Sequence, residues 1–177
     1  STGVLRTDAF QEIYFVGITQ PITKWSYQIR RPEDIPWAVA RAFYIAGTGR
    51  PGPVVLDFNK DAQVAMTEYI PQVVESVRSY IPYPAPSKEA VARAAELINR
   101  SERPFVLVGQ GVELGGATEE LKEFIEKAGI PAARTMLGLS ALPSDHRLCV
   151  GMLGMHGRKV SNDYINESDL LIMVGAR

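Results

Sequence analysis

Short apolar runs that end in glycine constrain the fold of this chain more than any other feature of its sequence. PFVLVG (104–109) and LLIMVG (170–175) are almost entirely apolar, and VVLDF (54–58) has a similar character. Strands covered on both faces by helices have such uninterrupted runs, whereas half-exposed strands alternate apolar and polar residues. The sequence therefore predicts a parallel sheet whose strands are buried between helices.

Helical patterns alternate with these apolar runs. RPEDIPWAVARAFYIAGTG (31–49) has apolar residues at helical spacing and two acidic residues in its first turn. Ser87 can cap a second helix, GATEELKEFIEKAG (116–129) indicates a third, and a short helix is expected near residues 160–165. IPAARTM (130–136) is a further candidate strand. This alternation is typical of an α/β fold with parallel strands joined by crossover helices.

The character of the sequence changes between Met66 and Ser87. This segment holds four of the 12 prolines of the chain, in words such as IPYPAPS. Proline fixes φ and removes a backbone donor, so the segment reads as a linker or strap that joins two units, with a boundary near residue 80.

Composition excludes several classes of function. The chain has 177 residues, of which 46% are hydrophobic, and a formal net charge of −1. This balance is typical of a globular protein and does not favour nucleic acid as a partner. No apolar run approaches the length of a membrane span. One cysteine and two histidines make a zinc site improbable, so no metal site is predicted, and the single cysteine favours a cytoplasmic location.

Three glycine-bearing loops are expected at one edge of the sheet. Ligands of open α/β sheets bind beyond the carboxyl ends of the strands, and the expected strands end at Gly109-Gln110-Gly111, at Thr135–Gly138 and at Gly175-Ala176-Arg177. The glycines of GQGVELGG come near the dinucleotide pattern GxGxxG without matching it. The alternative interpretation is that these glycines only turn a strand into a helix.

The word GMLGMHG (151–157) combines three glycines, two methionines and a histidine. Glycine lets a main chain approach a flat ligand, methionine packs softly on aromatic rings, and His156 could donate a hydrogen bond. The alternative is that Met152, Leu153 and Met155 belong to the core and that His156 is a capped turn residue. His146 is expected in a surface turn, and Cys149 is expected to be small and buried.

Two cations are candidates for binding phosphate or carboxylate. Arg50 lies in the GRPGP turn, and Lys60 follows the expected strand 54–58. Each is more often a solvated or salt-bridged side chain. Phe10 and Gln11, in TDAFQE, carry no physical signal of their own.

Several short motifs of the sequence occur together and in the same order in one known family. They are TDAFQE, VGITQPITKWSY, GRPGPVVLDFNKDAQ, VGQGV, TMLGLSALPSDH, GMLGMHG and ESDLLIMVGAR. With them the chain resembles the catalytic large subunits of acetolactate synthase (acetohydroxyacid synthase), which depend on thiamine diphosphate. The likeness covers nearly the whole chain. Two departures are the glutamine of VGQGV and the order of methionine and leucine in TMLGL.

The resemblance implies a domain organisation and a set of site residues. Residues 1–65 would be the end of the pyrimidine-binding domain, 66–86 a proline-rich linker, and 87–177 the first part of a Rossmann-like, FAD-associated central domain. Phe10, Gln11 and Lys60 would lie near the approach of substrate to thiamine diphosphate. The positions that would lie along FAD are Arg50, Gly109, Gln110, Gly111, Thr135, Met136, Leu137, Leu153, Gly154, Met155, His156, Gly157, Gly175, Ala176 and Arg177.

The resemblance also implies an activity and its partners. A full-length member joins two pyruvates, or pyruvate and 2-oxobutyrate, with loss of CO2, in branched-chain amino acid biosynthesis. It uses thiamine diphosphate, Mg2+ and a largely structural FAD, and it forms dimers that often bind a small regulatory subunit. The activating glutamate and the GDG-type metal motif of the family are absent, so we expect an internal fragment that is inactive alone. The alternatives are a non-catalytic nucleotide-binding or FAD-binding module, or a related oxidase or decarboxylase.

Overall fold

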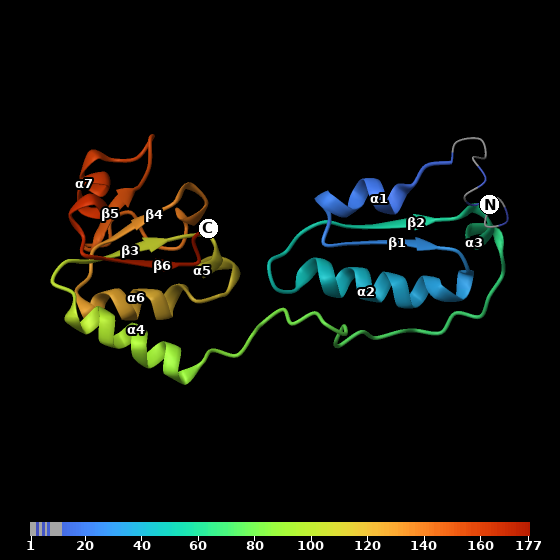
Figure 1. Cartoon of the computed structure of the whole chain (residues 1–177), viewed down its shortest axis with the longest axis horizontal. Helices are drawn as coiled ribbons and strands as arrows, with labels where there is room; N and C mark the ends of the chain where they lie inside the picture. Colours follow the sequence, from blue (N-terminus) through green and yellow to red (C-terminus); the bar gives the residue numbers. More distant parts are fainter. Residues whose placement is uncertain (1–2, 4, 6, 8–11) are drawn as a thin grey trace. The chain divides into compact units, whose positions relative to one another are not determined.

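The computed structural model describes residues 3, 5, 7 and 12–177 and divides the chain into two compact units, 1–85 and 86–177. The predicted α/β class is confirmed in both, since each has parallel strands packed against helices. Figure 1 shows the helices and strands of each unit.

The first unit is built on a pair of parallel strands, β1 (Trp25–Ile29) and β2 (Val54–Phe58), in register from Trp25 opposite Val54 to Ile29 opposite Phe58. Helix α1 (Phe15–Thr19) lies on one face of the pair and α2 (Ile35–Gly47) on the other (Figure 1). The short elements η2 (Gln20–Ile22), η3 (Pro32–Asp34) and α3 (Lys60–Val64) complete the unit.

The helix predicted over 31–49 is present but begins later. Residues 32–34 form the 3-10 turn η3, and the α-helix starts at Ile35, with Pro36 in its first turn, where a missing N–H costs nothing. Ala38 and Ala42 are buried as the pattern indicates, whereas Phe43 is 77% exposed. Aromatic side chains fill the α2 face of the strands: Trp25 and Tyr27 stack, and Trp37 meets both edge-on.

Tyr80 connects the proline-rich segment to the rest of the first unit. Its hydroxyl donates to the Thr48 carbonyl oxygen (2.8 Å) and accepts from Lys24 Nζ (3.0 Å). Lys24 also donates to the carbonyls of Ile45 and Thr48 at the end of α2. A cation suits this negative end of the helix dipole. The hydrogen bond from Lys24 lowers the pKa of Tyr80. Tyr80 therefore anchors the segment to Lys24 and to the end of α2.

The second unit is a four-stranded parallel sheet in the order β5-β4-β3-β6. Its strands are β3 (Pro104–Val108), β4 (Ala132–Arg134), β5 (Cys149–Met152) and β6 (Leu170–Val174). Helices α4 (Lys88–Arg100) and α6 (Thr118–Ala128) lie on one face, and α7 (Lys159–Glu167) lies on the other (Figure 1). The short α5 (Gly111–Leu114) follows β3, and η4 (Met136–Gly138) follows β4.

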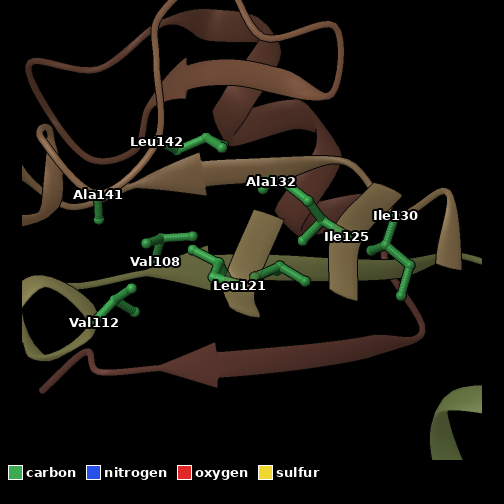
Figure 2. Close-up of a cluster of buried hydrophobic side chains, with 9 residues drawn as sticks. Val108, Val112, Leu121, Ile125, Ile130, Ala132, Ala141 and Leu142 are labelled. Carbon is green, nitrogen blue, oxygen red and sulfur yellow. The ribbon is translucent and has the colours of Figure 1, made fainter. Parts of the chain in front are cut away.

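Local sequence explains the ends of these helices. The Ser87 side chain accepts from the N–H of Ala90 and caps α4, as predicted. Gly129 ends α6 with φ of 66°, a left-handed conformation that glycine adopts without strain. The apolar positions of α6 face the sheet: Leu121 and Ile125 are 5% and 0% exposed and pack toward Val108 and Ala132 (Figure 2). This contact holds α6 against the centre of the sheet.

Strand order reverses at β3. The chain proceeds from β3 to β4 and then to β5 on one side, and returns with β6 to the opposite side of β3. Such a reversal opens a crevice at the carboxyl ends of the two strands that flank it, the usual ligand position in this type of sheet. The fold therefore singles out the ends of β3 and β6.

Candidate functional site

Four loops follow the carboxyl ends of the four strands in the second unit. Because the strands are parallel, residues 109–111, 135–138, 153–157 and 175–177 all lie at one edge of the sheet. Hydrogen bonds continue the strand pairing into these loops: Gly109 N to Val174 O (2.9 Å), Thr135 N to Val108 O (2.8 Å) and Leu153 N to Arg134 O (3.0 Å). The structure thus brings together every predicted site residue of the second unit.

Bare backbones are packed against each other at the end of β3 and β6. A Cβ added to Gly109 would lie 2.3 Å from the Gly175 carbonyl oxygen, and one on Gly111 would lie 2.7 Å from the Gly175 Cα. Gly175 itself has φ of 62°, and Gly111 N donates to its carbonyl oxygen at 2.9 Å. These glycines are required by contact between main chains, which goes beyond turning a strand into a helix.

The loop after β4 presents apolar side chains at the same edge. Gly138 is buried, and a Cβ there would lie 2.6 Å from the Val108 carbonyl oxygen. By contrast, Met136 and Leu137 are 61% and 67% exposed. Large apolar side chains held open to solvent by a tightly packed turn are typical of a ligand surface.

The loop 153–157 is also exposed. Met155 is 91% exposed, so the alternative that placed it in the core is wrong, and His156 is exposed as well. Gly154 has φ of 108° in open space, whereas a Cβ on Gly157 would lie 2.3 Å from the Met152 carbonyl oxygen. Part of the GMLGMHG word is strand β5, and the remainder is a turn beyond it.

Two polar residues that the sequence patterns did not indicate shape these loops. Arg134 is 5% exposed, and its guanidinium donates to the carbonyls of Leu139 (2.8 Å) and Leu142 (2.5 Å) and to Ser144 Oγ (3.1 Å). Asn162, on α7, is bonded through its amide to the main chain of Gly154. No local sequence pattern predicts such residues, because their hydrogen-bond partners lie several residues away and come close only in the folded chain.

The remaining predicted site residues belong to the first unit. Arg50 is exposed in the loop between α2 and β2, and Lys60 is the exposed first residue of α3, preceded by the buried Asn59. Phe10 and Gln11 lie outside the described residues.

Two minor expectations need correction. His146 is no free surface residue, because its side chain is only 8% exposed, its Nε2 lies 2.9 Å from Glu126 Oε1, and its Nδ1 accepts from Leu148 N. The hydrogen bond with His146 lowers the pKa of Glu126. Cys149 opens strand β5 and is partly exposed. Both residues therefore help to begin β5.

A cavity of about 570 Å³ lies at the opposite, amino end of the strands, lined by residues that include Arg103, Phe105 and Tyr164. It is separate from the four loops. Within residues 12–177 and the three described residues before them, no group of three or more His, Cys, Asp or Glu side chains could hold a metal ion. No helix of the described residues is long and apolar enough to cross a membrane.

Comparison with known proteins identifies the family. Residues 91–177 match the family model of the thiamine pyrophosphate enzyme central domain. Over 99% of its length the chain is 42% identical to the acetolactate synthase large subunit of Corynebacterium glutamicum, and over 98% it is 42% identical to the isozyme 1 large subunit of Escherichia coli. The chain belongs to the family of acetolactate synthase large subunits.

One solved structure has a similar fold. It is a thiamin diphosphate-dependent enzyme isolated from Mycobacterium smegmatis, 30% identical, with a TM-score of 0.73 over 98% of this chain and 34% of its own. The chain spans 28% and 30% of the length of the two acetolactate synthase large subunits. The resemblance first seen in the sequence words is thereby confirmed.

Proposed function

We propose that this chain is a segment of an acetolactate synthase that condenses two pyruvates, or pyruvate and 2-oxobutyrate, with loss of CO2 in branched-chain amino acid biosynthesis. The identity to large subunits of that enzyme, 42% in two bacteria, supports the proposal. The activity belongs to the full-length protein, because this chain spans less than a third of those relatives.

The two units are assigned to two domains of that enzyme. Residues 1–65 are the end of the pyrimidine-binding domain, 66–86 the linker, and 87–177 the first part of the central domain. The match of residues 91–177 to the central-domain model supports the last assignment. The hydrogen bonds of Tyr80 to Lys24 and to the Thr48 carbonyl support a linker that is attached, near residue 80, to the rest of the first unit.

FAD is proposed to lie along the carboxyl edge of the second unit. The observation that carries this proposal is the combination of close-packed glycine backbones at 109, 111 and 175 with the exposed Met136, Leu137 and Met155 on the other loops of the same sheet edge. Main chain without Cβ atoms lets an extended dinucleotide approach, and thioethers pack on a flat ring. The positions named from the resemblance, with His156 and Arg177 as polar contacts, would surround it.

Thiamine diphosphate and Mg2+ are proposed to be held by other parts of the full-length protein. When bound, thiamine diphosphate supplies the carbanion chemistry, and the protein supplies position and charge. Within this chain, Phe10, Gln11 and Lys60 are proposed to lie on the approach of substrate. Arg50 is proposed, from the resemblance, to be one of the FAD-binding residues. The exposed ammonium of Lys60, next to the buried Asn59, would attract a carboxylate substrate.

The assembly is likewise a proposal. The matched relatives are named large subunits, which supports a smaller regulatory partner for this protein. A homodimer or higher oligomer, and a cytoplasmic location, stay predictions from the resemblance.

The FAD site is tested by placing a carboxylate on its apolar wall. In the full-length protein that carries this chain, Met155→Glu should weaken FAD binding at least tenfold, measured by quenching of flavin fluorescence. Met66→Glu is the matched control, because Met66 is 96% exposed and lies in the first unit. Equal affinity in the two variants would place FAD elsewhere.

The reaction is tested with the same full-length protein. Pyruvate with thiamine diphosphate, Mg2+ and FAD should yield acetolactate, with a flavin absorption spectrum that pyruvate leaves unchanged. Bleaching of the flavin by substrate would favour a related oxidase instead, and FAD binding without turnover would favour a non-catalytic module. The 177-residue chain alone should form no acetolactate.

A further inference from the structure

The turn at Gly154 has no packing of its own to hold it in one conformation. Apart from Gly154 and its two chain neighbours, no heavy atom of the described residues lies within 4 Å of the Cβ position of Gly154, and the side chain of the next residue, Met155, is 91% exposed. Glycine loses more backbone freedom on ordering than any other residue. A defined shape of this loop therefore depends on hydrogen bonds made by its main chain.

Asn162 supplies two of these hydrogen bonds. Its Oδ1 accepts from Gly154 N at 3.0 Å, and its Nδ2 donates to the Gly154 carbonyl oxygen at 3.1 Å. A side-chain amide has both a donor and an acceptor, whereas a carboxylate can only accept and an aliphatic side chain does neither. One side chain thus engages both main-chain groups of Gly154; the carbonyl oxygen is shared with Gly157 N (2.9 Å), whereas the N–H donates to Asn162 alone among the described residues.

Asn162 is itself fixed relative to strand β5. Ser161, its neighbour on α7, is fully buried, and its hydroxyl donates to the Val150 carbonyl oxygen at 2.8 Å. Arg158 N, just before the helix, donates to Met152 O at 2.9 Å. These bonds tie the start of α7 to β5, so the Asn162 amide is a rigid reference point for the loop.

We propose that Asn162 is a positioning residue that fixes the Gly154 turn and thereby presents Met155 and His156 at the carboxyl edge. It acts through Gly154 and needs no contact with the cofactor. The inference rests on the proposed FAD site, since its functional consequence is tighter binding of a ligand to a preformed loop. Ordering a loop before binding reduces the entropy cost of association.

The first test measures the turn without any ligand. Amide hydrogen exchange of Gly154, followed by NMR in the 177-residue chain, should be about tenfold faster in Asn162→Ala, the factor expected for one lost hydrogen bond. Asn162→Asp keeps an acceptor and loses the donor, so its exchange should be intermediate. Amides of β3 should be unchanged in both. Unchanged exchange at Gly154 would overturn the inference.

The second test measures FAD affinity in the full-length protein that carries this chain. Asn162→Ala should bind FAD about tenfold more weakly, while Asn99→Ala, the same change on the exposed face of α4, should bind normally. Faster Gly154 exchange with unchanged affinity would overturn the positioning role alone. A wild-type protein that binds no FAD would instead overturn the proposed cofactor site, and the positioning role with it.

Discussion

The contact between glycine backbones at the end of β3 and β6 makes a quantitative prediction about three alanine substitutions. Gly116 has φ of 66° and open space around its Cβ position, so Gly116→Ala introduces backbone strain alone. Gly109 has no positive φ, so Gly109→Ala introduces only overlap, with backbone atoms at 2.3 and 2.4 Å. Gly175 combines both, with φ of 62° and Val112 N at 2.5 Å.

The expected costs follow from these distances. A left-handed alanine costs roughly 1–2 kcal/mol, and the loss of unfolded-state freedom returns up to about 1 kcal/mol, so Gly116→Ala should destabilise by about 1 kcal/mol. Overpacking costs about 1–3 kcal/mol, and separating the strands also weakens the bond from Gly109 N to Val174 O, which brings Gly109→Ala to about 3 kcal/mol. Gly175→Ala combines the strain and the overlap, so it should lower the free energy of unfolding by about 4 kcal/mol, a large part of the stability of a small domain.

Urea unfolding of the 177-residue chain measures these differences. Both tryptophans, Trp25 and Trp37, lie in the first unit, so their fluorescence reports that unit, whereas far-ultraviolet circular dichroism reports both. The three substitutions should lower the midpoint of the second unit in the order Gly116, Gly109, Gly175 and leave the tryptophan transition in place. If Gly175→Ala and Gly116→Ala unfold at the same urea concentration, the close approach of the backbones is refuted.

Three further changes test individual polar contacts. Hydrogen bonds from Ser101 Oγ and two backbone N–H groups lower the pKa of Asp169. The ionised carboxylate therefore stabilises the fold above its unfolded-state pKa, and this contribution is lost as pH falls through the folded-state pKa. Asp169→Asn should make the urea midpoint depend less on pH between about pH 6 and 2. The hydrogen bond from Lys24 lowers the pKa of Tyr80, so Tyr80→Phe should remove a phenol that ionises below its usual range in an ultraviolet titration. Loss of the same hydrogen bonds should speed proteolysis within residues 66–82. Arg134→Met should destabilise the second unit by about 2–4 kcal/mol in urea, since the part-buried Leu139 carbonyl and the buried Leu142 carbonyl lose a charged donor; no change would show that the guanidinium is dispensable.

Local patterns predicted several elements, but not how far they are buried: β3 is buried along most of its length, whereas Leu171 and Met173 of the edge strand β6 are 40% and 63% exposed, which corrects the expectation that helices cover both of its faces. Strands 104–108 and 170–174 were predicted from uninterrupted apolar runs, and helix 118–128 from its spacing and its terminal Gly129. Strand β1 was not predicted, because WSYQI includes polar Ser26 and Gln28 that are satisfied within the fold, the latter by Asp57 at 2.9 Å. Strand β5 was not predicted, because its second half, Gly151 and Met152, belongs to the glycine-rich segment GMLGMHG; it forms through its pairing with β4.

The location of the candidate site was predictable, whereas its supporting residues were not. A strand that ends in glycine indicates a loop at the carboxyl edge, and the parallel pairing brings those loops together regardless of their separation in sequence. Arg134 and Asn162 act over eight residues through partners that only the folded chain brings near. The exposure of Phe43 likewise could not be read from its helical position, because spacing defines a face but not what covers it.

The strand order has a consequence for synthesis on the ribosome. Strand β3 ends at Val108, but its second neighbour, β6, begins only at Leu170. During N-to-C translation one flank of the central strand therefore stays unpaired while more than sixty later residues emerge. Because the Gly109–Gly175 contact cannot exist on the shorter nascent chain, cofactor capture at this edge would be a late step of biogenesis and could not nucleate the fold.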